Sequence, residues 1–350
     1  MSLIPAHFPG LCFACSCFAA LSLSPASAEE GKDLRYPTPQ NDQDWIVDLA
    51  VENDLFGSGL DRHYTNGMRL AVVLPGDYTS DFLNQAASYF PLFNDKATPR
   101  LVVSAGQSMF TPEDITISGP QPDQRPWAGW AYGGVGLVAP ASNGQQLDTL
   151  ELQIGVVGPA SFAGDTQVWW HEVIGSPRPL GWDNQLKNEP GIVLSYERKY
   201  RALFGQTDLV EGYGFDLTPH WGMSLGNVFT HGAAGATLRF GNDLPDDYGP
   251  PRIRPSLPGS SYFSADDNFG WYLFAGVEGR LVGRNIFLDG NTFRDSHSVD
   301  KEYLVGDLQG GLALRIKNTR IAFTWIWRTR EYDGQTDPDA FGSISLSQRF

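Results

Sequence analysis

Cysteine is scarce in this sequence and confined to one end of it. The cysteines are Cys12, Cys15 and Cys17. They fall in or beside an apolar run, Leu11 to Leu23, that is followed by the small residues Ala26 to Ala28, which is the layout of a secretory signal peptide. We therefore predict that residues 1–28 are removed. The mature chain, 29–350, would be one domain without thiols, which excludes disulfides, cysteine nucleophiles and cysteine-ligated metals.

Basic residues and long apolar runs are also few. Lys and Arg number 25 against 40 Asp and Glu, a net charge of −15, and the absence of a basic stretch argues against a nucleic-acid partner. Beyond the signal peptide, no apolar run approaches the roughly 20 residues of a transmembrane helix. Such a chain can cross a membrane only as a closed β-barrel, because only helices and barrels satisfy their backbone in lipid. Aromatic residues, by contrast, make up 13% of the chain, as the aromatic girdles of a membrane barrel would require.

Alternation with a period of two runs through the mature sequence. Residues 321–328 show it most clearly, because Ile321, Phe323, Trp325 and Trp327 alternate with Ala322, Thr324, Ile326 and Arg328. Large apolar side chains on one face and small or polar ones on the other are typical of a strand with lipid outside and a lumen inside. Residues 45–52 and 67–74 follow the same pattern.

Twelve such runs predict an all-β fold, a transmembrane antiparallel up-and-down barrel of about 12 strands. The predicted strands are 44–53, 64–74, 99–109, 128–139, 147–157, 191–202, 213–224, 228–240, 269–282, 302–317, 319–331 and 340–350. Each is close to the 9 to 11 residues of a tilted membrane strand, and an even number suits a bacterial barrel. The chain also ends in Phe350, and a terminal aromatic residue on an alternating strand looks like the recognition signal of bacterial outer-membrane barrels.

The connection 158–190 is the longest, and loops of this length are usually functional or disordered. Residues 162–175 within it predict a short helix, followed by a Pro/Gly/Asn-rich loop. Gln167 and His171 are one turn apart on that helix and therefore share a face. A histidine between tryptophans and the helix end is, taken alone, more often an interfacial or packed residue than a catalyst.

A second group of polar residues lies between the first two predicted strands, in 52–54 and 61–67. Taken alone it is an ordinary Asp/Asn/Gly-rich hairpin loop. With both termini on the periplasmic side, however, this loop and the helix with His171 both lie at the outer end of the barrel. Alternation places several polar residues of this region on the lumen face: Asp48, Glu52, Asp54, Thr65 and Arg69. We therefore expect a carboxylate, an amide, a hydroxyl and an imidazole to converge at the outer rim.

Several of these motifs resemble those of a known protein family. The segments 52–54 and 61–67, then Gly158 to Ala160, Gln167 to His171 and Gly181 to Leu186 resemble, in this order, the lipid A 3-O-deacylase family. The resemblance covers nearly all of the mature chain. It implies a twelve-stranded outer-membrane barrel that removes the 3-position acyloxyacyl chain of lipid A and depends on a divalent cation, usually Ca²⁺.

Five residues match the active site of that family. They are Asn53, Asp54, Thr65, Gln167 and His171. The resemblance implies catalytic roles for His171, Gln167, Thr65 and Asn53, and metal ligation by Asp54 and Asn53. The match is poor at 110–127, where the family has a basic residue on the substrate and this chain offers only Arg125.

A mechanism follows from these residue types as a hypothesis. Neutral His171 would take a proton from water, Gln167 would orient the ring or the substrate, and Asp54 would hold Ca²⁺, which prefers oxygen ligands and polarises the ester carbonyl. No serine in a Gly-x-Ser-x-Gly setting lies near this group, which favours water as the nucleophile. His63 is expected to be a solvated rim residue.

Two further classes of function remain open, besides an outer-membrane phospholipase-like acyl hydrolase. A channel would use the same barrel with a wet lumen, and an adhesin would use the loops 158–190 and 283–301. The preferred hypothesis is a Ca²⁺-dependent carboxylic ester hydrolase, and we expect it to be a monomer. It would lie in the outer membrane of a Gram-negative bacterium, with lipopolysaccharide as its substrate and its active site facing the outer leaflet.

Overall fold

The computed structural model describes most of the chain from residue 43 onward. The described residues are 43–57, 59, 61–79, 85, 89, 90, 92, 93, 99–141, 144–201, 207–210, 213–242, 244, 247–249, 262, 263 and 269–350. The signal peptide predicted over 1–28, its cleavage site and the cysteines lie outside them. Within the described part, no helix combines the length and apolar character needed to cross a bilayer.

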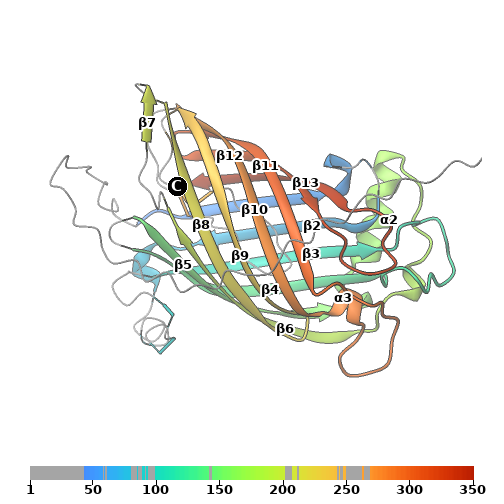
Figure 1. Cartoon of the computed structure of the whole chain (residues 1–350). Helices are drawn as coiled ribbons and strands as arrows, with labels where there is room; N and C mark the ends of the chain where they lie inside the picture. The colour runs from blue at the N-terminus through green and yellow to red at the C-terminus, as the bar shows by residue number, and fades with distance from the viewer. Residues whose placement is uncertain are drawn as a thin grey trace, which may run out of the picture. The chain divides into compact units, whose positions relative to one another are not determined.

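Antiparallel strands account for most of the described residues (Figure 1). They are β1 (Ile46–Asn53), β2 (His63–Val73), β3 (Arg100–Thr111), β4 (Ala128–Pro140), β5 (Gln146–Val157), β6 (Glu189–Tyr200), β7 (Thr207–Val210), β8 (Tyr213–Gly226), β9 (Phe229–Asn242), β10 (Phe269–Asn285), β11 (Leu304–Ile316), β12 (Thr319–Arg328) and β13 (Asp339–Arg349). Each strand pairs with the strands before and after it in the chain, except that β6 pairs with β8 and not with β7.

The sheet closes into a barrel of twelve strands. The first strand, β1, pairs with the last, β13, and β6 pairs directly with β8, so the ring is complete without β7. The short β7 pairs only with β8 and extends one hairpin. The predicted twelve-stranded barrel is therefore confirmed, and β7 is an addition that four residues without clear alternation could not reveal.

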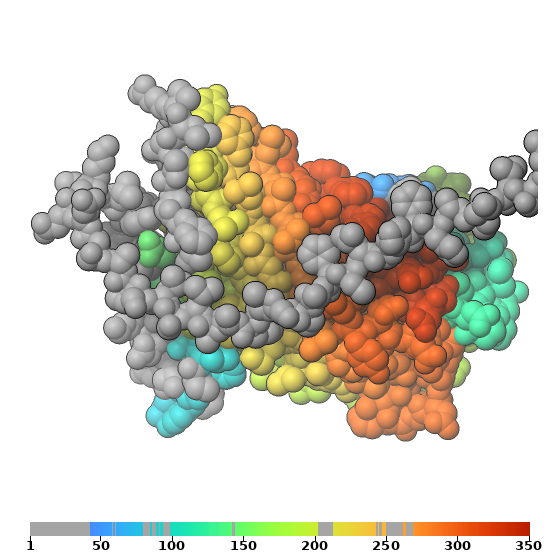
Figure 2. Space-filling model, in the orientation of Figure 1, coloured from blue at the N-terminus to red at the C-terminus, as the bar shows by residue number. Residues whose placement is uncertain are grey.

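The two faces of the wall have the character that the alternation predicts. In β12, Ile321, Phe323 and Trp325 are 41%, 43% and 38% exposed, whereas the residues between them are buried. Figure 2 shows the outer surface that β8 to β12 form together. Large apolar side chains on the outside suit a wall that faces lipid tails.

Aromatic side chains fill the lumen near its outer end. Tyr64, Phe110, Trp130 and Phe341 belong to one buried cluster there, and the one-turn helix α3 (Ile286–Asp289) adds Phe287, whose ring stacks on Phe110 with centroids 3.9 Å apart. Ion pairs occupy the lumen further along, for example between Arg69 and Glu151, 3.3 Å apart. A lumen packed in this way argues against an open channel.

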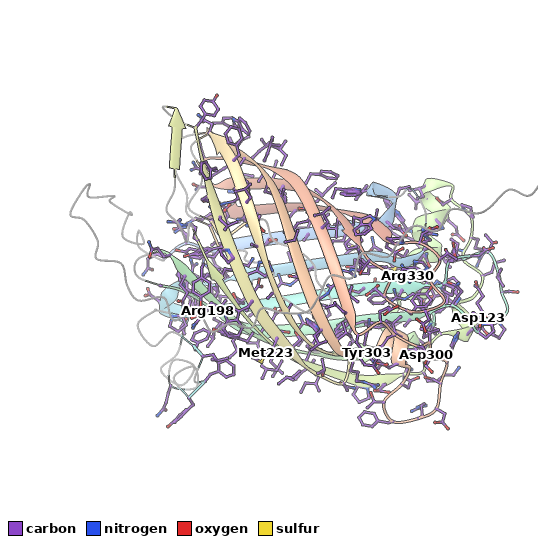
Figure 3. All side chains as sticks on the ribbon, viewed as in Figure 1. Asp123, Arg198, Met223, Asp300, Tyr303 and Arg330 are labelled. Atoms are coloured by element: carbon purple, nitrogen blue, oxygen red, sulfur yellow. The ribbon has the colours of Figure 1, made fainter. Side chains whose placement is uncertain are left out.

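The helices α2 and α3 lie at one end of the barrel and the C-terminus at the other, where the 3-10 helix η2 (Gly76–Tyr78) also lies (Figure 1). Asp123, Asp300 and Arg330 mark the helical end in Figure 3, and Arg198 marks the opposite end. The helix predicted over 162–175 is α2 (Ala163–Ile174), and its residues have the expected one-turn spacing. Three short 3-10 helices also belong to the helical end: η1 (Asp54–Phe56), η3 (Pro159–Ser161) and η4 (Trp182–Asn184).

Candidate active site

The helix α2 lies against the outer face of the barrel wall, where a glycine makes room for it. Gly129 of β4 shares the outward-facing register of Gly133, and a Cβ atom at Gly129 would lie 2.1 Å from Ser161 Oγ and 2.3 Å from Ala163 Cβ. The first turn of α2 therefore touches the wall directly. Around this contact, α2 packs in a cluster of buried apolar residues: Met109, Ile115, Trp127, Ala163 and Trp182.

The sequence of α2 defines which of its sides faces the wall. Gly175 ends the helix in the left-handed conformation, with φ 71°, and its N–H donates to the carbonyl of His171. Gln167 and His171 are buried on one face, whereas Trp169 and Trp170 are 60% and 46% exposed on another. The helix thus presents its two candidate catalytic residues to the barrel and its tryptophans to the surroundings, as an interfacial helix would.

Hydrogen bonds fix the orientation of the His171 ring. Nδ1 lies 2.5 Å from the carbonyl oxygen of Pro177, and Nε2 lies 2.7 Å from Oδ2 of Asp61. A carbonyl can only accept, so Nδ1 carries a proton and Nε2 is the nitrogen that can take up another.

Asp61 is the residue on which the site converges. Its carboxyl accepts hydrogen bonds from the amide of Gln167, at 3.1 Å and 3.3 Å, and from the side chain of Thr65. The Gln167 amide oxygen in turn accepts from the indole N–H of Trp182 at 2.8 Å. The α2 residues are thereby connected to the loop between β1 and β2, which is more than 100 positions away in the chain.

The residues before and after that loop are also held together. The Asn53 side chain donates to the carbonyl of Thr65 at 3.0 Å and accepts from the N–H of Leu55 at 2.9 Å, which caps η1. Oδ2 of the buried Asp54 accepts from the N–H of Arg62 at 2.7 Å. All five residues predicted from the sequence therefore lie in one site with Asp61.

The place of this site differs from the expected one. Asp48, Glu52 and Arg69 are buried in the barrel interior as predicted, but the site itself forms between α2 and the outer face of the wall. The difference begins at a β-bulge between Tyr64 and Asn66, where Thr65 drops out of the register with β3. A bulge redirects the side chain it carries, so alternation could not place Thr65.

The two carboxyl groups of the β1–β2 loop are in an unusual electrostatic environment. Burial raises the pKa of Asp54 well above its ordinary value, and the nearby charge of Asp61 raises it further, although donation from the Arg62 N–H opposes both. Burial also raises the pKa of Asp61, against the lowering effects of His171, Thr65 and Gln167. Perturbed acids that converge on a histidine are common at functional sites.

The donor set fits a hard divalent cation. Asp54 and Asp61 each make the ionisation of the other less favourable, so a cation between them would stabilise both charges. Their carboxylate oxygens and the amide oxygen of Asn53 are of the kind that Ca²⁺ prefers. In the part of the chain that the structure describes, no group of three His, Cys, Asp or Glu side chains gathers as a metal cluster. Any cation here would complete its coordination with neutral oxygens from the protein, the substrate or water, which Ca²⁺ accepts and Zn²⁺ rarely does.

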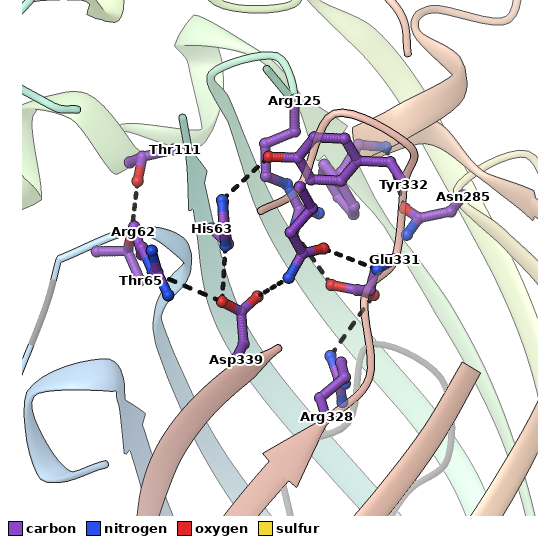
Figure 4. Close-up of polar contacts among 12 residues, drawn as sticks. Arg62, His63, Thr65, Thr111, Arg125, Asn285, Arg328, Glu331, Tyr332 and Asp339 are labelled. Carbon is purple, nitrogen blue, oxygen red and sulfur yellow. Dashed lines mark hydrogen bonds and ion pairs between the residues drawn. The ribbon is translucent and has the colours of Figure 1, made fainter. Parts of the chain in front are cut away.

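His63 is not the solvated rim residue that we expected. It is fully buried, with a positive φ of 62°, and its ring lies between Asp339 Oδ1 at 2.7 Å and the hydroxyl of Tyr332 at 3.0 Å (Figure 4). The hydroxyl also donates to Gln124 at 2.8 Å. This network ties the start of β2 to the loop before β13, a connection between residues 276 positions apart that local sequence could not show.

Arg125 does not reach the site either. Its guanidinium is buried over the ring of Phe110, with 4.9 Å from Cζ to the ring centroid, and it pairs with Glu331 at 3.2 Å. Glu331 also lies 3.7 Å from Arg328. Arg125 therefore stabilises the outer end of the lumen and is not placed to contact a substrate between α2 and the wall.

Sequence reasoning missed Asp61 and Trp182 as site residues. Both lie inside the segments that resemble the deacylase family, but neither has a neighbour in sequence that suggests its role. Only the fold brings Asp61 to His171 and Trp182 to Gln167.

Comparison with known proteins supports the resemblance. The family model described as outer membrane protein LpxR matches residues 11–350. The solved structure of LpxR from Salmonella typhimurium has a TM-score of 0.69 with this chain at 19% identity, covering 87% of this chain and 100% of that one. The β domain of the Bordetella autotransporter BrkA has a TM-score of 0.42 at 7% identity, with coverages of 88% and 98%. No curated protein sequence matches the chain.

Proposed function

The chain belongs to the LpxR family of Gram-negative outer membrane proteins, and on this basis we propose that it is a lipid A deacylase. In this proposal it hydrolyses the 3-position acyloxyacyl ester of lipid A with water as the nucleophile, and a divalent cation assists. The observation that carries the proposal is a histidine held through Nδ1 by the Pro177 carbonyl, with Nε2 beside the Asp61 carboxyl, between an interfacial helix and the lipid-facing wall.

His171 is the base. Pro177 holds the ring through Nδ1, so Nε2 faces the space that Asp61 occupies in this structure. The Asp61 side chain is 27% exposed, so a water molecule would reach Nε2 beside this carboxyl. As the water oxygen bonds to the acyl carbon, Nε2 takes its proton; the ester C–O bond breaks, and the proton passes to the departing sugar oxygen. The products are a fatty acid and an alcohol.

The other residues position these groups. Gln167 and Thr65 hold the Asp61 carboxyl, and Trp182 fixes the amide of Gln167. Asp54 and Asp61, with the amide oxygen of Asn53, would hold the cation. A bound divalent cation supplies Lewis-acid polarisation of the ester carbonyl and charge for the developing oxyanion.

The test is mass spectrometry of lipid A from cells that produce the wild type, His171→Ala or His297→Ala. His297 is a matched control, because it lies in an outer loop and its Nε2 is 3.3 Å from the carbonyl of Pro122. We expect the wild type and His297→Ala to remove the mass of one acyloxyacyl unit, and His171→Ala to remove none. EDTA should block the loss in a membrane assay.

Two results would count against the proposal. Full deacylation by folded His171→Ala would remove the histidine from its role as base. Unchanged lipid A in all strains, with phospholipid cleaved instead, would favour the phospholipase-like alternative.

A further inference from the structure

A recess runs along the lipid-facing wall below α2. It is shallow and open, with a volume of about 600 Å³. Leu49, Met68 and Leu70 form one side of it, and Ala105, Gln107, Ala131 and Gly133 contribute its floor. We call these seven residues the wall groove.

The register of the sheet explains why the wall is hollow there. One row of outward-facing residues crosses five strands from β1 to β5 in the order Leu49, Leu70, Ala105, Gly133 and Ile154. Leu70 and Ile154 project from the wall and are 47% and 58% exposed, whereas the two positions between them have little or no side chain. A row on the other side of the barrel has no such interruption, since Leu273, Leu312, Phe323 and Ile344 are its members.

The groove leads to the candidate active site. At its outer end, the amide of Gln107 donates to the carbonyl of Ser161 at 2.6 Å, and Ser161 lies in η3, which leads into α2. Asn53 is on the same face of β1 as Leu49, four residues or about 13 Å further along the strand. The groove and the site are therefore successive parts of one surface, the first in the depth of the acyl chains and the second at the membrane interface.

We propose that the wall groove binds the acyl chain attached to the ester that the enzyme cleaves. This inference rests on the proposed function and specifies how the substrate is held. The groove is apolar and open to the bilayer, so a chain enters it without leaving a hydrocarbon environment. Its contribution is accordingly orientation: a chain aligned in the groove places its ester carbonyl at His171, and orientation of reacting groups accounts for large rate factors.

Filling the groove tests this directly. Gly133→Leu would place a branched side chain in the floor, and the variant should fold, because a Cβ atom at Gly133 meets nothing closer than Ser104 O at 4.0 Å. The matched control is Gly232→Leu, at an exposed position of β9 where a Cβ atom meets nothing within 4 Å. We expect kcat/KM for lipid A to fall about a hundredfold in Gly133→Leu, in line with a displacement of the ester by about 1 Å. In Gly232→Leu it should stay within about twofold of the wild type.

A second measurement does not depend on catalysis. Lipid A with a photoreactive diazirine in an acyl chain is incorporated into nanodiscs with the full protein, and the labelled peptides are mapped. We expect adducts to concentrate on 100–140, to be displaced by unlabelled lipid A but not by phosphatidylcholine, and to decline in Gly133→Leu.

The two measurements separate the groove from the reaction. Labelling that is even around the barrel, or wild-type kinetics in Gly133→Leu, would overturn the groove. Concentrated labelling by a wild type that hydrolyses no lipid ester would support the groove and refute the proposed function.

Discussion

The contact between Gly129 and the start of α2 makes a sharp prediction. In Gly129→Ala, the new methyl group would lie 2.1 Å from Ser161 Oγ and 2.3 Å from Ala163 Cβ. Ser161 can rotate, but the Cβ atom of Ala163 is fixed to the helix backbone. The variant must therefore push the first turn of α2 away from the wall, although the substitution itself is as small as a substitution can be.

The size of the effect follows from the contact distance. Carbon atoms in contact are about 3.5–4.0 Å apart, so the separation of 2.3 Å must grow by about 1.2–1.7 Å. Gln167 and His171 move with the helix, whereas Asp61 stays with the barrel. Because a misplacement of about 1 Å can cost about a hundredfold in rate, we expect kcat/KM to fall by about two orders of magnitude, or about 2.7 kcal/mol.

The assay is the initial rate of lipid A deacylation by purified protein in mixed micelles, with Gly232→Ala as the control. Gly232 has open space around it, so its variant should match the wild type. Hydrogen exchange at 163–174 should increase in Gly129→Ala, while exchange in the barrel strands should not. Wild-type activity in Gly129→Ala, despite a loosened α2, would refute the idea that contact with the wall positions the catalytic residues.

Three further variants test other parts of the site. Trp182→Phe removes the indole N–H that holds Gln167. We expect kcat to fall about fivefold, the equivalent of about 1 kcal/mol, with little change in KM. A change confined to KM would contradict a positioning role for Trp182. Asp61→Asn should raise the Ca²⁺ concentration for half-maximal activity about tenfold, measured by titration, and an unchanged requirement would remove Asp61 from the cation site. At the outer end of the lumen, burial alone would raise the pKa of Glu331, but neighbouring guanidinium groups hold it below the usual 4.5. The ionised carboxylate of Glu331 therefore stabilises the fold at pH values above 4.5, and this stabilisation is lost as pH falls through the depressed pKa. We expect Glu331→Gln to increase hydrogen exchange in 329–338 at pH 7 but not in strong acid.

Much of the fold was predictable because a barrel wall is a repeating environment. In β12, each outward position contacts lipid and each inward position contacts the lumen, so the rule holds at every residue from Ile321 to Trp327. The helix α2 was predictable because Gly175 ends it locally, although no side chain caps its start at Phe162. By contrast, β7 and α3 are too short for a periodic signal, and α3 depends on the burial of Phe287 by residues from other strands.

The site was predictable in its members but not in its geometry. Asn53, Asp54, Thr65, Gln167 and His171 could be identified from motifs, and the fold brings them together. The contact between His171 and Asp61 joins two segments 110 residues apart, and no local pattern encodes it. His63 was misinterpreted for the same reason, because its partner, Asp339, comes from the other end of the chain.

The outer face of the wall is also the place where a barrel can act on lipid. The inner face is not available, since aromatic rings such as Phe110 and Phe287 fill the outer end of the lumen and charged pairs occupy it further along. A lipid moving in the outer leaflet meets only the outward-facing side chains, so a base inside the barrel would never reach its ester. A helix placed against the outer wall solves this, because it holds His171 and Gln167 on the face of the wall that lipid can reach. This close approach of the helix needs a wall without a side chain at the point of contact, and Gly129 supplies it.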